Sequence, residues 1–179
     1  MDQTASQKVL EPAIVRSMRK YYFGAAALIV LLDQLTKWLV SKEILLHDQI
    51  TIVPGFFSLT HRVNPGAAFG LFSDSDSPWR LVFLVLFSTV AMCVVSVLLW
   101  KNGHLLTTTG VGLALILGGA IGNLWDRIVA GHVVDFLLFY LGSYQWPAFN
   151  VADSAIVVGA VLVMGEIVFA NHSGAKDPS

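Results

Sequence analysis

Charged side chains are scarce in this chain. Only 13% of its 179 residues are Asp, Glu, Lys or Arg, whereas 55% are hydrophobic. A soluble globular chain carries about a quarter charged residues, so the composition excludes an ordinary water-soluble domain and requires an apolar solvent. The formal net charge of −1 also leaves no basic surface, and no nucleic-acid partner is expected.

Cysteine and metal-binding motifs are nearly absent as well. Cys93 is the single cysteine, so an intramolecular disulfide is excluded. It lies inside an apolar run, which predicts a small buried hydrophobe. His61 and His132 belong to no H-E-x-x-H or Cys/His pattern, so no metal and no cofactor is expected. Ser154 has no G-x-S-x-G elbow around it, and serine catalysis is therefore not supported.

Long apolar runs dominate what is present. Four of them approach the roughly 20 residues that cross a bilayer, at about 22–40, 79–100, 105–126 and 151–170. The first run exceeds the roughly 7–15 apolar residues of a cleaved signal peptide, and no A-x-A-like site follows it. The sequence thus predicts an all-α membrane protein, a bundle of four transmembrane helices.

The chain leaves no room for a separate soluble domain. We expect one transmembrane domain over 21–171, with an N-terminal tail over 1–20 and a C-terminal tail over 172–179. Lys and Arg accumulate on cytoplasmic flanks, which predicts cytoplasmic termini and outward-running first and third helices. The residues that carry this bias are Lys8, Arg16, Arg19, Lys20, Lys101 and Lys176.

Two outer connections follow from that topology. In the first, Pro54-Gly55 is a turn signal between β-branched and aromatic residues, which predicts a small extracytoplasmic strand or hairpin. The glycine-rich run at 64–70 predicts a short interfacial helix or lid that continues through Phe72. In the second, the apolar run at 133–140 is too short to span and favours an interfacial or re-entrant segment.

The polar residues of four separate segments are predicted to lie at one depth, the outer ends of the helices. Ionisable groups inside a membrane are costly and usually face a bundle interior or a wet cavity, which favours one shared site. Within each helix their spacing of three or four residues puts them on one face. These residues are Asp33, Lys37, Asn64, Asn123, Asp126, Arg127, Asp135, Asn150 and Asp153.

Structural interpretations of the same residues remain open. Asp33/Lys37 and Asp126/Arg127 could be ion pairs that only support the fold, with Lys37 extending to the membrane interface. Asp135 has hydrophobic neighbours on both sides and would be expensive to ionise alone. It needs a partner, for which Asp153 is the leading candidate, either for chemistry or to fix the second connection against the fourth helix.

Five motifs occur in a fixed order along the chain. They are DQLTK at 33–37, NPGAAFG at 64–70, GGAIGNLWDR at 118–127, VVDF at 133–136 and FNVAD at 149–153. Together with the four spans, they make the chain resemble the lipoprotein signal peptidases, also called signal peptidase II. The resemblance covers about residues 22–170.

The resemblance implies a catalytic pair at Asp135 and Asp153. The substrates it implies are prolipoproteins that carry diacylglyceryl on a cysteine, cut just before that cysteine. It also implies inhibition by globomycin, contact with membrane lipid, and a place in the bacterial inner (cytoplasmic) membrane with the active site near the periplasmic face. We expect a monomer. The positions that it assigns to substrate binding or support are Asp33, Lys37, Asn64, Gly66, Asn123, Asp126, Arg127, Asn150 and Ala152.

The chemistry suits such residues, because two carboxylates sharing one proton supply both a base for water and an acid for the peptide carbonyl. Which aspartate is the base stays open. Two other classes also remain, a small proton-coupled transporter and a non-catalytic membrane scaffold. The transporter is disfavoured because the carboxylates gather at one face rather than at the midplane, and no inverted repeat is visible.

Overall fold

The computed structural model describes residues 17–66 and 79–174, and within them four long helices. Each is long and apolar enough to cross a membrane. They are α1 (Arg19–Glu43), α2 (Trp79–Asn102), α3 (Thr108–Ala130) and α4 (Val151–Gly174). The prediction of four helices of this length and hydrophobicity is confirmed. Helix α3 starts three residues later than predicted because Thr107 caps it, its side chain accepting a hydrogen bond from the Gly110 N–H.

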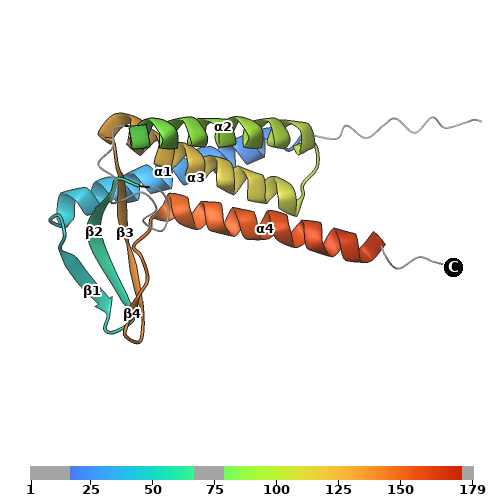
Figure 1. The fold of residues 1–179 in the computed structure, drawn as a ribbon. Coiled ribbons are helices and arrows are strands. Elements are labelled where there is room, and N and C mark those ends of the chain that lie inside the picture. Colours follow the sequence, from blue (N-terminus) through green and yellow to red (C-terminus); the bar gives the residue numbers. More distant parts are fainter. Residues whose placement is uncertain (1–16, 67–78, 175–179) are drawn as a thin grey trace, which may run out of the picture.

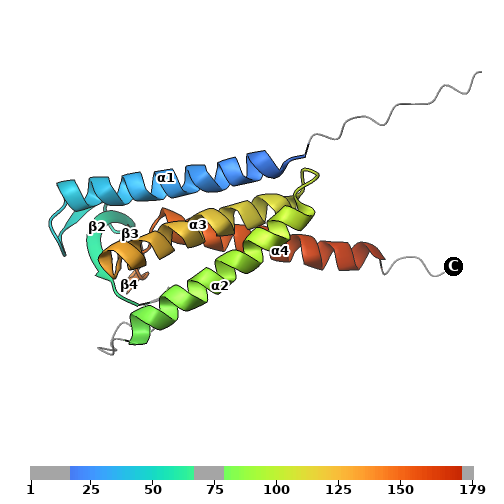
Figure 2. The same cartoon turned by 90° about the horizontal axis from the view of Figure 1, so that it is seen from above.

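The helices lie side by side, and the small sheet stands at one end of the bundle (Figures 1 and 2). Helices α1 and α3 run toward the sheet, and α2 and α4 run away from it. The start of α1 and the end of α4 therefore share the end opposite the sheet, as the predicted topology requires. Helix α3 packs against the other three helices.

Small residues allow α3 this central position. A Cβ on Gly119 would collide with the backbone carbonyl of Ala152 in α4, and a Cβ on Gly118 would meet the Ala26 carbonyl of α1. The Cβ that Gly122 lacks would fall 2.6 Å from Oδ2 of Asp33. The close approach of α3 to its neighbours thus depends on glycine and brings the polar residues of three helices together.

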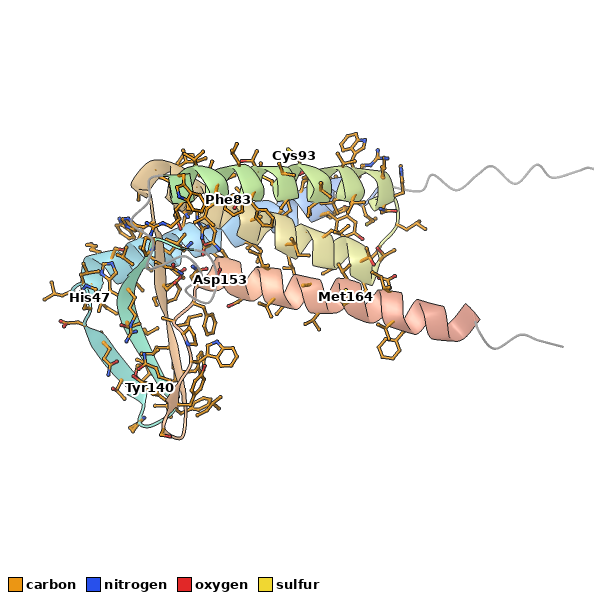
Figure 3. All side chains as sticks on the ribbon, in the orientation of Figure 1. His47, Phe83, Cys93, Tyr140, Asp153 and Met164 are labelled. Atoms are coloured by element: carbon orange, nitrogen blue, oxygen red, sulfur yellow. The ribbon has the colours of Figure 1, made fainter. Side chains whose placement is uncertain are left out.

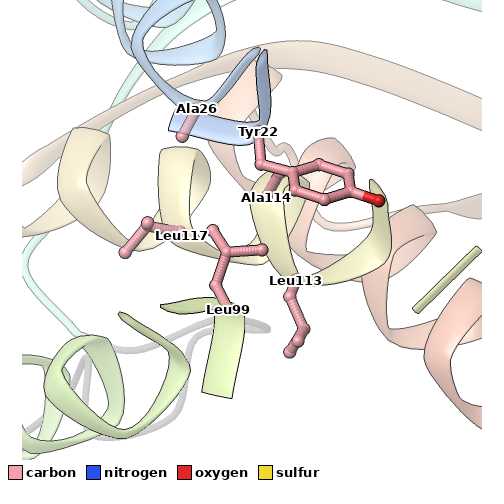
Figure 4. Packing of buried hydrophobic residues seen from close by; sticks show 6 residues of the cluster. All are labelled: Tyr22, Ala26, Leu99, Leu113, Ala114 and Leu117. Carbon is pink, nitrogen blue, oxygen red and sulfur yellow. The ribbon is translucent and has the colours of Figure 1, made fainter. Parts of the chain in front are cut away.

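The hydrophobic core lies in the half of the bundle away from the sheet (Figure 4). The hydroxyl of Tyr22 donates to the Leu105 carbonyl at 2.8 Å and accepts from the Thr107 N–H at 2.9 Å. These bonds tie α1 to the connection before α3. The clustered side chains are Tyr22, Ala26, Leu99, Leu113, Ala114 and Leu117. Cys93 is exposed on α2 (Figure 3), so the prediction that it is buried is wrong.

The sheet is antiparallel with the order β1-β2-β3-β4. Its strands are β1 (Gln49–Val53), β2 (Phe57–Asn64), β3 (Val133–Leu141) and β4 (Tyr144–Gln145). The predicted hairpin at Pro54-Gly55 is confirmed, and Gly55 takes the positive φ of 71° that favours glycine. The apolar run at 133–140 is a strand, β3, and not a re-entrant segment, because β2 pairs with its backbone along its length.

The sheet is fastened to the bundle by apolar contacts. Phe136 of β3 is buried against Val40 and Ile44 at the end of α1. Strand β3 is thereby held beside the ends of the helices that adjoin the sheet. The predicted lid or interfacial helix, from Ala67 onward, lies outside the described residues, as do most of the N-terminal tail and the last five residues of the C-terminal tail.

Candidate active site

Asp135 is a buried carboxylate on β3, with only 4% of the residue exposed. Its Oδ2 accepts a hydrogen bond from Nδ2 of Asn64 at 2.9 Å, and its Oδ1 accepts one from Nδ2 of Asn150 at 2.8 Å. Burial raises the pKa of this carboxyl to about 7, and the negative charge of Asp153 adds to the rise, while the two amide donors and Lys37 oppose it. Asp135 can therefore carry a proton near neutral pH.

Asp153 lies in the first turn of α4 (Figure 3). Asn150 directly precedes the helix, and its Oδ1 accepts a hydrogen bond from the Asp153 N–H at 2.9 Å. In return, Oδ2 of Asp153 accepts from the Asn150 N–H at 3.3 Å, so the two residues form a reciprocal capping box. Oδ1 of Asp153 accepts from Nδ2 of Asn123 at 2.8 Å. Two hydrogen bonds thus orient the carboxylate of Asp153, and a third holds its backbone.

Asn150 joins the two aspartates. It is fully buried, donates to Asp135 through Nδ2, and caps the turn that carries Asp153 through Oδ1. The negative charge of Asp153 is felt at Asp135. The structure therefore brings together the strand carboxylate and the helix carboxylate that the sequence paired.

A second group of charges lies behind this pair. The Lys37 ammonium is 4% exposed and donates to Oδ2 of Asp33 at 2.7 Å, to Oδ2 of Asp126 at 2.6 Å and to Oδ1 of Asn123 at 3.1 Å. The Asp33/Lys37 pair is confirmed. The prediction that Lys37 extends to the interface is wrong, because two carboxylates and an amide hold it inside. Asp126 pairs with Lys37 rather than with Arg127.

Asp33 reaches across the bundle to α4. Its Oδ1 accepts a hydrogen bond from the Ala152 N–H at 2.9 Å, while its Oδ2 faces Lys37. The first N–H groups of a helix lack partners within the helix, and a carboxylate of another helix satisfies this one. Asp33 thereby fixes the turn of α4 that carries Asp153.

Gln34 belongs to the same group, although sequence reasoning missed it. Its Nε2 donates to Oδ1 of Asp126 at 2.8 Å and lies 3.3 Å from Oδ2 of Asp33. Its spacing of three residues from Lys37 places it on a shared helix face. That spacing is the signal that could have indicated it.

Arg127 fastens the end of β2 to α3. Its Nη2 donates to the Gly66 carbonyl at 2.9 Å, and its Nη1 donates to the Asn123 carbonyl at 3.1 Å. The Gly66 N–H donates to Oδ1 of Asn64 at 2.9 Å. A continuous chain of hydrogen bonds thus leads from Arg127 through Gly66 and Asn64 to Asp135.

All the predicted site residues belong to one hydrogen-bonded network at the sheet end of the bundle. They come from α1, β2, α3, β3 and α4. Among residues 17–66 and 79–174, no cluster of three or more His, Cys, Asp and Glu side chains is placed to hold a metal ion. His61 instead uses Nδ1 to contact the Ile44 carbonyl at 2.8 Å. The arrangement offers two adjacent carboxyl groups and fixed amide donors, a set suited to acid–base chemistry.

Comparison with known proteins agrees with this geometry. The family model for signal peptidase (SPase) II matches residues 25–169. A lipoprotein signal peptidase of Solibacter usitatus (strain Ellin6076) is 45% identical over 154 residues, covering 86% of this chain and 94% of that protein. One from Neisseria meningitidis serogroup C (strain 053442) is 43% identical over 162 residues, covering 90% of this chain and 97% of that protein.

A solved structure has the same fold. It is a bacterial membrane enzyme determined by the in meso method at 2.3 Å resolution, with a TM-score of 0.78 at 25% identity, covering 89% of this chain and 94% of that one. The family model matches most of the chain, and both relatives align along nearly their whole length. The chain therefore belongs to the signal peptidase II family.

Proposed function

We propose that this chain is an intramembrane aspartyl endopeptidase that removes the signal peptide from diacylglyceryl-modified prolipoproteins, cutting just before the modified cysteine. The observation that carries the proposal is the pair Asp135 and Asp153, both hydrogen-bonded to the buried Asn150 at the sheet end of the bundle. Family membership supports the peptidase activity and the prolipoprotein substrate.

The chemistry is hydrolysis by water. Two carboxyl groups that share one proton provide a base that takes a proton from water and an acid that donates one to the scissile carbonyl. The raised pKa of Asp135, to which the charge of Asp153 contributes, supports such sharing near neutral pH. The reaction requires no metal and no cofactor.

The depth of the site suits the substrate. A diacylglyceryl group holds its cysteine at the level where acyl chains meet headgroups, and the carboxylates lie where the apolar helices meet the sheet. Trp79, Tyr144 and Trp146 lie at the sheet end of the bundle, and their side chains are exposed. Exposed Trp and Tyr residues are typical of a membrane interface. The adjacent peptide bond would therefore come to the dyad without leaving the membrane surface.

The remaining residues hold the dyad in place. Asn64, Asn123 and Asn150 orient the two carboxylates, and Asp33 with Ala152 fixes the start of α4. Lys37, Asp126 and Arg127 link α1, α3 and the Gly66 turn. This network agrees with the supporting roles that the resemblance assigns.

Further parts of the proposal follow from the family and the charge bias. We place the chain in the bacterial inner membrane as a single transmembrane domain with cytoplasmic termini, so that the sheet and the site face the periplasm. We propose a monomer in contact with membrane lipid and inhibition by globomycin.

The test is cleavage of a purified prolipoprotein by the purified chain in detergent or lipid. Matched substrates with and without diacylglyceryl are compared, and the product is identified by mass spectrometry. We expect cleavage of the lipidated form alone, with the modified cysteine as the new N-terminus and no loss of activity in EDTA. Failure to cut a lipidated substrate would contradict the proposal and favour a transporter or scaffold. Loss of activity in EDTA would indicate a metalloenzyme instead.

A further inference from the structure

We propose that the two aspartates have fixed and different roles: Asp153 is the ionised member of the resting pair and acts as the base, and Asp135 holds the proton and acts as the acid. This assignment rests on the proposed peptidase function. Its basis is the unlike surroundings of the two carboxylates, one at the start of a helix and the other inside a strand.

The hydrogen bonds and the helix start around Asp153 favour a negative charge on it more than the surroundings of Asp135 do. It lies in the first turn of α4, where the helix dipole stabilises anions. The Asn150 N–H and the Asn123 amide both donate to it. The oxygen of that Asn123 amide accepts from the Lys37 ammonium at 3.1 Å, which polarises the amide and strengthens its donation to Asp153.

The surroundings of Asp135 favour the protonated form. It lies on β3 between Val134 and Phe136 rather than on a helix, and both of its donors are neutral side-chain amides. Burial and the charge of Asp153 raise its pKa to about 7. Below that pH the pair carries one negative charge, which stays on Asp153 at the start of α4.

The other charged groups around the pair do not reverse this preference. Lys37 of α1 is ion-paired with Asp33 and Asp126, and its charge acts on both aspartates of the pair rather than on Asp135 alone. Arg127 of α3 donates to two backbone carbonyls rather than to Asp135. On β2, Arg62 is the register partner of Asp135, but its side chain is exposed to solvent.

The assignment sets the path of each proton. Asp153 takes a proton from water, whose oxygen bonds to the scissile carbonyl carbon, while Asp135 donates its proton to the carbonyl oxygen and a gem-diol forms. Asp153 then gives its proton to the leaving nitrogen as the C–N bond breaks, and Asp135 recovers a proton from a diol hydroxyl. One water is consumed, and the resting pair is restored.

The pH dependence of kcat/KM tests the assignment, because its two limbs report the ionisations of the free enzyme's base and acid. Asn64 donates to Asp135 and not to Asp153, so Asn64→Ala removes a bond that favours ionised Asp135. We expect the alkaline limb to move up by about one pH unit, because the free energy of one such hydrogen bond corresponds to about one pKa unit. The acidic limb should stay unchanged. Asn64→Ser provides a second variant if Asn64→Ala does not fold.

Asn123→Ala is the matched control on the other carboxylate, because Asn123 donates to Asp153 and not to Asp135. It should move the acidic limb and leave the alkaline one. A shift of the acidic limb in the Asn64 variants would reverse the roles, and equal shifts of both limbs in each variant would show that no fixed roles exist. A wild-type chain that cuts no substrate at any pH would instead contradict the peptidase function itself.

Discussion

The raised pKa of Asp135 predicts that this protein is less stable at alkaline than at acidic pH because of one carboxyl group. In the folded chain its pKa is about 7, against an ordinary value of 3.8. Between these values the folded state binds more protons than the unfolded state. Stability therefore falls as the pH rises from about 4 to 7 and levels off above that range.

The size of this effect follows from the two values. One pKa unit corresponds to 1.36 kcal/mol, so ionised Asp135 costs the fold at most about 4 kcal/mol at pH 8. Asn150 and Asn64 donate to different oxygens of Asp135, so one of them can still donate to the single amide oxygen of an asparagine at this position. Asp135→Asn should therefore be more stable than the wild type at pH 8 by roughly 2–4 kcal/mol, and this difference should shrink by about 2.7 kcal/mol by pH 5.

The assay is thermal or denaturant unfolding of both proteins in one detergent between pH 5 and pH 8. Glu43→Gln is the control, because it removes a carboxylate with 67% of its side chain exposed, and it should retain the wild-type dependence. An Asp135→Asn variant whose stability changes with pH as steeply as that of the wild type would refute this reasoning. So would a variant that is less stable than the wild type at pH 8.

Three further outcomes are expected. Lys37→Met leaves Asp33 and Asp126 buried without their cation, so unfolding experiments should show a loss of about 3–5 kcal/mol; a loss below about 1 kcal/mol would be inconsistent with the observed contacts. Gly119→Val should separate α3 from α4 and abolish cleavage, whereas a substitution at a glycine without close neighbours should not. Glu166→Ala removes the acceptor of the Thr109 N–H at the start of α3, which should cost about 1 kcal/mol, and Glu166→Gln should recover most of that loss.

Hydrophobicity and charge were enough to predict the helices. A run of about 20 apolar residues can satisfy its backbone groups in lipid only as a helix or a closed barrel, so the four spans followed directly. The depth of the polar residues followed from their positions in those spans. The spacing of Asn150 and Asp153 also indicated a shared face. In the capping box the side chain of each residue accepts a hydrogen bond from the backbone N–H of the other.

Partners that depend on tertiary contacts were not predictable in the same way. Strand β3 looked like a short apolar segment, because its pairing with β2 depends on residues about 75 positions away. The position of Lys37 in its helix predicts a side chain that reaches the interface, but Asp126 of another helix pairs with it inside the bundle. For the same reason Gln34 was missed and Asp33 was not recognised as a cap of α4.

The most direct test of the aspartate dyad is single-turnover cleavage of a lipidated prolipoprotein by Asp135→Asn and Asp153→Asn, each shown to be folded. Asp126→Asn is the comparison, because Asp126 contacts Lys37 and Gln34 and has no hydrogen bond to either dyad member. We expect each dyad variant to lose at least a hundredfold in rate, the lower range for removal of a general acid or base, and Asp126→Asn to lose less. Cleavage at near wild-type rate by either folded dyad variant would contradict the account and make Asp126 the next candidate.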